Sequence, residues 1–214
     1  INISLMLILM SFTGIYYVEE TPQEPKELSQ THMPLYAVSP GHPVFGEYVG
    51  QHWCGPCMNS ASPSLSNLKS SNPEDFTFVS FFNSPDDSPI DRINHVAASA
   101  GGIPVFSFAD RQSGSCFKVG ASGTNYYDSD YANGGCMGPN SNDFSLDLIT
   151  SLDTSTDQVT ITLDITYIGT LSAISVYVYG AITEKIGAES YDNGVNPHHN
   201  FRQWLLNGND DGFT

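Results

Sequence analysis

Residues 44–57 read VFGEYVGQHWCGPC, and this stretch decides the expected fold of the chain. The alternation from Val44 to Gly50 predicts a β-strand, and the residues from Cys54 to Ser70 are typical of a helix. Pro63 falls inside that helix and predicts a kink. The cysteine pair therefore stands where a strand passes into a helix.

The residues that follow extend this pattern into an α/β fold. Phe76 to Phe82 (FTFVSFF) is a continuous apolar run, as in a buried central strand. Ser88 and Pro89 open a second expected helix up to Gly101, and Pro104 to Phe108 reads as another strand. The order strand, helix, strand, helix, strand predicts a sheet covered by helices on both faces.

The two cysteines after Trp53 carry the strongest chemical signal. Cys54-Gly55-Pro56-Cys57 places two sulfurs one turn apart at a helix N-terminus, where free N–H groups and the helix dipole stabilise a thiolate. Cys54 is the expected nucleophile and Cys57 the resolving thiol. Half of a zinc site and a plain structural disulfide are the alternatives.

These motifs together resemble the thioredoxin superfamily. VFGEYVGQHWCGPC is followed about fifty residues later by GGIPVFSF, and the resemblance covers roughly residues 40 to 153. It implies that Ile103 packs beside the cysteines, that Pro104 is a cis proline, and that the open backbone edge there pairs with substrate. The implied site residues are Cys54, Cys57, Trp53, Gly55, Pro56, Ile103 and Pro104, with neither a cofactor nor a metal.

One position departs from the family pattern. Thioredoxins usually carry a buried carboxylate six positions before the first cysteine, whereas this chain has Tyr48 there and Glu47 one position earlier. Neighbouring residues of a strand face opposite sides, so Glu47 is expected to point away from the cysteines unless a bulge re-aims it.

A long segment rich in Gly, Ser, Asn and Tyr follows, bracketed by Cys116 and Cys136. A disulfide between these cysteines would close a loop of about twenty residues and contribute about 3 kcal/mol. A solvated surface loop is expected, and a ligand surface or calcium site is the alternative for Tyr126, Tyr127, Asp128, Asp130 and Tyr131. Asn142 is then expected to cap a helix over DFSLDLITSL.

The composition changes after Asp153. QVTITLDITYIG and LSAISVYVYGAITE alternate with period two around Gly169-Thr170, which predicts an antiparallel pair in an all-β module spanning 154–214. This part resembles the immunoglobulin-like module of thioredoxin-fold surface lipoproteins, with Glu184, His199, Asn200 and Arg202 at the matching positions. About sixty residues are few for a sandwich, so an incomplete module is expected. The adjacent His198 and His199 are assigned a structural role.

The first residues suggest a membrane segment. Residues 1–18, INISLMLILMSFTGIYYV, carry no charge, which favours a signal peptide or a transmembrane anchor over a buried core helix. Residues 19–43 are proline-rich and are expected to be a linker. The expected organisation is thus anchor, linker, thioredoxin-like domain over 44–153, and β module over 154–214.

Composition narrows the function classes. With 7 Lys plus Arg against 23 Asp plus Glu, the net charge is -16, which disfavours nucleic acid as a partner. The expected function is an extracytoplasmic, membrane-anchored or secreted thiol–disulfide oxidoreductase. It would reduce or isomerise disulfides of exported proteins with electrons from a transmembrane donor. A surface binding or adhesion protein with a merely structural CxxC is the alternative, and copper handling through His52, Met58 and His95 is a weaker one.

Overall fold

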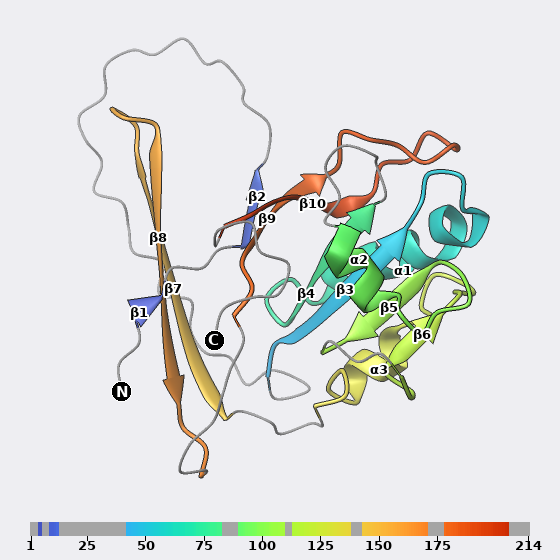
Figure 1. Ribbon diagram of the computed structural model, residues 1–214, viewed down its shortest axis with the longest axis horizontal. Coiled ribbons are helices and arrows are strands. Elements are labelled where there is room, and N and C mark those ends of the chain that lie inside the picture. The colour runs from blue at the N-terminus through green and yellow to red at the C-terminus, as the bar shows by residue number, and fades with distance from the viewer. Residues whose placement is uncertain are drawn as a thin grey trace.

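The computed structural model describes residues 4–5, 9–12, 42–82, 90–109, 113–137, 143–170 and 178–205 (Figure 1). The helical elements are the π-helical turn η1 (Cys57–Ala61), α1 (Ser62–Ser71), α2 (Ile90–Val96) and α3 (Asp128–Ala132). The strands are β1 (Ser4–Leu5), β2 (Leu9–Phe12), β3 (Val44–Gly50), β4 (Phe76–Phe82), β5 (Val105–Phe108), β6 (Phe117–Val119), β7 (Phe144–Asp153), β8 (Gln158–Tyr167), β9 (Ala181–Ile186) and β10 (His198–Trp204).

A mixed seven-stranded sheet in the order β2-β9-β10-β4-β3-β5-β6 forms the centre of the protein. Strands β10, β4 and β3 run parallel to one another, while β5 and β6 continue the sheet in antiparallel pairing. Because β4 lies between β10 and β3, both its edges are paired and its FTFVSFF run is almost wholly buried.

The two faces of this sheet bury different clusters. The first, which we call the cysteine face, contains both Cys54 and Cys57 with aromatic residues such as Phe78 and Phe106, and it is covered by α1. The second, which we call the ion-pair face, includes Val49, Phe81 and Val105, and it is covered by α2. The predicted α/β sheet with helices on both faces is therefore confirmed.

The predicted elements around the cysteines are confirmed with small shifts. The strands Val44–Gly50 and Phe76–Phe82 have the predicted bounds, and the third begins at Val105. The helix after Cys54 passes through the π-helical turn just before Pro63, where Ser62 N–H donates to the carbonyl of Cys57. Proline clashes with the carbonyl four residues before it, and the widened turn relieves this clash.

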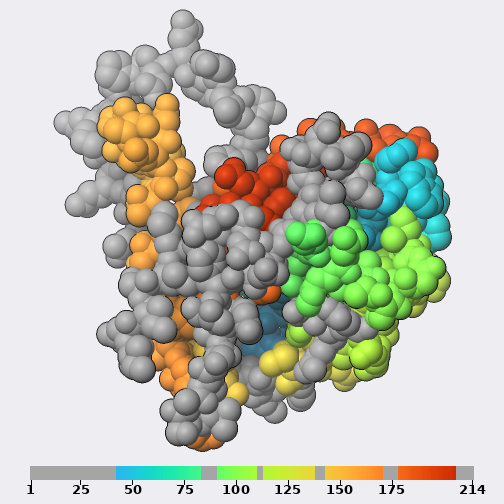
Figure 2. Space-filling model, in the orientation of Figure 1, coloured from blue at the N-terminus to red at the C-terminus, as the bar shows by residue number. Residues whose placement is uncertain are grey.

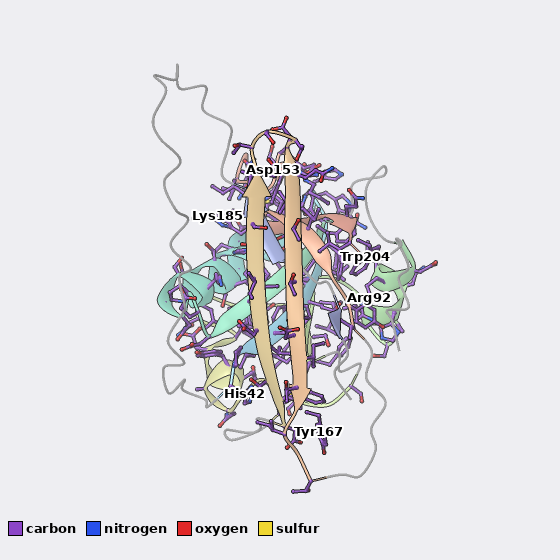
Figure 3. The ribbon with its side chains drawn as sticks, turned by 90° about the vertical axis from the view of Figure 1, so that its left-hand side faces the viewer. His42, Arg92, Asp153, Tyr167, Lys185 and Trp204 are labelled. Atoms are coloured by element: carbon purple, nitrogen blue, oxygen red, sulfur yellow. A yellow bond between two sulfur atoms is a disulfide. The ribbon has the colours of Figure 1, made fainter. Side chains whose placement is uncertain are left out.

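The prediction of a helix over DFSLDLITSL is wrong. These residues form β7, which pairs along its whole length with β8 in an antiparallel hairpin. Phe144, Leu146 and Leu148 alternate with polar residues and stand opposite Tyr167, Ile165 and Leu163, so one face of the hairpin is apolar. Figures 1 and 2 show the hairpin at one side of the molecule, away from α1, and Figure 3 shows Asp153 and Tyr167 at its opposite ends.

The described strands after Asp153 belong to two sheets. The expected boundary between 153 and 154 falls at the turn of the β7–β8 hairpin, and β8 pairs with β7 and β1. Of the strand predicted over 171–184 as the partner of β8, residues 171–177 lie outside the described residues, and its last residues belong to β9, which pairs with β2 and β10. β10 lies beside β4, and Ser80 Oγ donates to the carbonyl of His198 at 2.6 Å. The large sheet is thus built from both halves of the chain.

The N-terminal predictions fall largely outside the described residues. Within 1–18, only 4–5 and 9–12 are described, as the short strands β1 and β2. Of the expected linker 19–43, the structure describes only His42 and Pro43. In the described part of the chain, no helix has the length and apolar character needed to cross a bilayer.

Candidate functional site

A disulfide between Cys54 and Cys57 lies where β3 passes into the helical segment, with the two Cα atoms 5.1 Å apart. Met58 N–H donates to the carbonyl of Cys54 at 3.1 Å, and Cys57 N–H donates to Cys54 Sγ at 3.2 Å. Cys54 therefore caps the helix N-terminus with its own sulfur, the position in which a thiolate is stabilised. Cys54 keeps 3% of its surface exposed and Cys57 none.

The other predicted site residues surround this pair. Trp53 is 58% exposed, and the space around Gly55 is open on the side that a Cβ would occupy. Ile103 packs against the cluster that contains both cysteines, and the Ile103–Pro104 peptide is cis, as expected. Pro104 is fully buried at the start of β5.

A pair of buried phenols lies on the cysteine face. The hydroxyl groups of Tyr48 and Tyr191 are hydrogen-bonded at 3.1 Å, and both residues are buried. A Cβ on Gly50 would overlap the Tyr48 phenol, so this glycine lets the ring lie along β3 towards the CxxC segment. Burial raises the pKa of both Tyr48 and Tyr191, which keeps the two phenols neutral.

Glu47 points to the other face of the sheet, as predicted. Its carboxylate accepts hydrogen bonds from Arg92 Nε at 2.7 Å and Nη2 at 2.6 Å, and the side chains of both residues are 4% exposed. The Arg92 guanidinium lies 4.6 Å from the centre of the Tyr179 ring. Among the described residues, Glu47 is the one buried carboxylate. The sheet thus separates it from the cysteines.

The loop between β9 and β10 contacts the CxxC segment, and the sequence did not reveal this. Asp192 N–H donates to the carbonyl of His52 at 3.0 Å, and His52 Nδ1 lies 3.0 Å from Asp192 Oδ1. The Asp192-Asn193-Gly194 triplet is a turn signal, but its partner lies 140 positions away. No local pattern shows such a contact. Figure 1 shows this loop beside the segment that joins β3 to the helix.

Three of the four C-terminal positions singled out in the sequence meet in one polar cluster. Arg202 binds Glu184 and Glu189, and Asn200 donates to Glu189 Oε2 at 2.7 Å. The hydrogen bond from Arg202 lowers the pKa of Glu189. The cluster lies in β9, β10 and the loop between them, and it fixes the start of that loop.

His199, the fourth of these positions, lies apart from the polar cluster. Its ring packs edge-on against Phe78 with centroids 4.9 Å apart. Burial, with smaller contributions from Lys69, His198 and Lys185, lowers the pKa of His199 to about 4. A neutral imidazole in the core fits the structural role assigned to it.

The second cysteine pair also forms a disulfide, with the Cα atoms of Cys116 and Cys136 5.8 Å apart. The loop that it closes is not wholly a solvated surface. Tyr127 and Tyr131 are buried in the cysteine-face cluster, while Asp130 pairs with Lys118 at 3.2 Å. The expected surface made by these residues is therefore divided between core packing and an ion pair.

The described residues form no cluster of three or more His, Cys, Asp or Glu side chains suited to a metal. Of the residues considered for copper, His52 and Met58 lie on the CxxC segment, whereas His95 is exposed on α2. Since α2 covers the ion-pair face, the structure does not bring these three side chains together.

Comparison with protein-family models gives no match for this chain. Comparison with curated proteins gives no significant match either.

Proposed function

We propose that the chain is a thioredoxin-like thiol–disulfide oxidoreductase that acts through Cys54 and Cys57. The observation that carries this proposal is the CxxC disulfide at a helix N-terminus, with the Cys57 N–H directed at Cys54 Sγ. A thiolate formed at Cys54 on reduction would keep that donor and gain the favourable end of the helix dipole. The resemblance of WCGPC and Ile103-Pro104 to the thioredoxin superfamily supports the same assignment.

The reaction follows from the burial of the two sulfurs. In the dithiol form, the Cys54 thiolate attacks one sulfur of a substrate disulfide, and the other substrate sulfur leaves as a thiolate. The Cys57 thiol then gives its proton to the substrate thiolate released in the first step, and its sulfur attacks Cys54 Sγ, which releases the second substrate sulfur as a thiolate and closes the Cys54–Cys57 disulfide. Two electrons pass to the substrate. Cys57 is assigned as the resolving thiol because it has no exposed surface, while Cys54 keeps 3%.

The direction proposed is reduction. The Gly55-Pro56 dipeptide resembles that of the reducing members of the superfamily, whose potentials are about -270 mV. A donor of two electrons must then restore the dithiol, and we propose a transmembrane donor. The Cys116–Cys136 disulfide favours an oxidising compartment, with disulfide-bearing exported proteins as substrates and residues 1–18 as the membrane segment.

Equilibration of the protein with glutathione tests the proposal. We expect a potential below that of the isomerase class, about -180 mV, and insulin reduction that Cys54→Ser abolishes. Cys57→Ser should trap mixed disulfides through Cys54. A Cys54–Cys57 pair that stays closed at every glutathione ratio, together with no insulin reduction, would identify a structural staple and overturn the proposal.

A binding protein is the second candidate, favoured by the exposed apolar row on β7. Leu146, Leu148 and Leu152 are 64%, 45% and 53% exposed on the same face of the hairpin. Apolar side chains grouped in this way often mark an interaction site. If the cysteine pair proves inert, the hairpin becomes the region to examine.

A further inference from the structure

The loop between β9 and β10 is held in shape by its own hydrogen bonds. At its base, Gly187 N–H donates to the carbonyl of Pro197 at 2.7 Å. At its tip, Tyr191 and Val195 are hydrogen-bonded at 2.8 Å around Gly194, whose φ of +80° suits glycine. The tip residues Tyr191 and Asp192 are therefore presented by a preformed turn.

This turn contacts the CxxC segment on both sides of the disulfide. Before Cys54, Asp192 binds the backbone and the ring of His52. After Cys57, the Tyr191 side chain packs in the same buried cluster as Cys57, with its hydroxyl near the Ser62 side chain, and Ser62 N–H donates to the carbonyl of Cys57. The two contacts thus restrain the backbone just before Cys54 and just after Cys57.

The inner contact is buried, which gives it more weight than the outer one. Tyr191 is 2% exposed, and its ring packs edge-on against Phe82 with centroids 4.8 Å apart. Its hydroxyl also meets that of Tyr48 on the central strand. The side chains of His52 and Asp192 are more than half exposed, so water competes for their side-chain contact and the backbone bond contributes more.

We propose that the Tyr191–Asp192 turn is a positioning element for the Cys54–Cys57 pair and keeps the two sulfurs close when the disulfide is open. This inference rests on the proposed function. In the disulfide form, the covalent bond itself fixes the spacing of the sulfurs. In the dithiol form that bond is gone, and the contacts to His52 and Ser62 restrain the segment in its place.

The expected consequence is a change in redox equilibrium. Thiols held close together close into a disulfide more readily, because less conformational freedom is lost when the bond forms. Weakening the turn should let the dithiol relax and make the disulfide less favoured. We expect the double variant Tyr191→Phe/Asp192→Ala, which keeps the aromatic ring in the core, to lower the equilibrium constant for disulfide formation about fivefold. This corresponds to a rise of about 20 mV in the potential.

The experiment is glutathione equilibration of the oxidised full chain and its variants, with alkylation to count the dithiol form. Asp192→Asn should return the constant to near the wild-type value, since asparagine keeps an acceptor for His52. Asp164→Ala, an exposed aspartate on β8, is the matched control and should have no effect. His52→Ala and Asp192→Ala should shift the constant by similar amounts and should not add when combined.

The outcomes separate the two proposals. If the wild type exchanges with glutathione and the folded double variant stays within twofold of it, the turn is structural only and this inference is overturned. If the wild-type pair never exchanges, the proposed function itself fails. The single variants Tyr191→Phe and Asp192→Ala repeat the comparison should the double variant lose its cooperative melting transition. In that case, two unchanged constants would likewise overturn the inference.

Discussion

The two faces of the central sheet bury polar groups in opposite ways. On the ion-pair face, Glu47 and Arg92 form a bidentate charged pair that is almost fully buried. On the cysteine face, the next residue, Tyr48, shares a hydrogen bond with Tyr191, and burial keeps both phenols neutral. A fixed charge beside the cysteines would alter the pKa of their thiols. The charged pair thus lies on the face away from the cysteines, and the neutral pair lies on the same face as the cysteines.

The largest effect on stability is expected for the buried pair of Glu47 and Arg92. Arg92→Met leaves Glu47 buried without the guanidinium, which should lower the free energy of unfolding by about 3 to 5 kcal/mol. Urea denaturation measures the loss. The double variant Glu47→Leu/Arg92→Met should recover most of it, because it removes the isolated charge. Neither change should shift the redox potential of the Cys54–Cys57 pair. A shift equal to that of the Tyr191 variants would show that the ion-pair face also influences the cysteines.

The next effect concerns the second disulfide, which packs against the cysteine face. Replacing Cys116 and Cys136 together by alanine should lower the free energy of unfolding by about 3 kcal/mol through loop-closure entropy. Denaturation with the Cys54–Cys57 pair kept oxidised measures this loss. Insulin reduction by the variant should continue at the wild-type rate. Loss of that activity would instead make the pair a redox relay.

A pH-dependent effect of similar size comes from His199. Its folded-state pKa of about 4 lies below the unfolded value of about 6.5, so the unfolded chain binds the proton first. This contribution to stability is complete above pH 6.5 and should fall by about 3 kcal/mol as the pH drops to 4. His199→Asn suits the positive φ of this residue and should remove that part of the slope. Identical slopes for the two proteins would refute the assignment.

The smallest effect on stability is expected for the hydrogen-bonded phenols of Tyr48 and Tyr191. Tyr48→Phe removes one hydroxyl of the phenol pair and should cost about 1 kcal/mol of unfolding free energy. Tyr191 keeps the Ser62 side chain as a polar neighbour, so the loss should stay modest. Calorimetry gives the change in stability. A loss as large as that of Arg92→Met would show that the two faces are not different in kind.

The sequence predicted the parts of the fold that depend on local pattern. The apolar run of β4 and the turn from β3 into a helix at Cys54 are confirmed. A helix is predicted over DFSLDLITSL because Phe144, Leu148 and Leu152 are spaced by four, as on one face of a helix. With Leu146 between the first two, the same residues also alternate with period two, as in a strand. Its pairing with β8 decided between the two patterns, and pairing is not visible in a single segment.

Some residues of the candidate site are likewise marked by local motifs, whereas others are placed by long-range pairing. Cys54, Cys57 and the Ile103–Pro104 peptide are marked by motifs, so a single sequence is enough to single them out. Tyr191 has no such motif, and it meets Tyr48 across 143 positions of chain. Its place follows from β9 and β10 joining the large sheet, a long-range arrangement that periodicity cannot predict.

Because β10 lies beside β4, one edge of β4 is completed only after residues 198–204 have been made. Synthesis proceeds from the N-terminus, so β3, the cysteine pair and β4 emerge well before His198–Trp204 exists to pair with them. During that interval one edge of β4 lacks its final partner, and Tyr48 lacks the phenol of Tyr191. An unpaired strand edge invites pairing with other chains. Until residues 198–204 have been made, this edge of β4 is therefore a place where the nascent chain can pair wrongly.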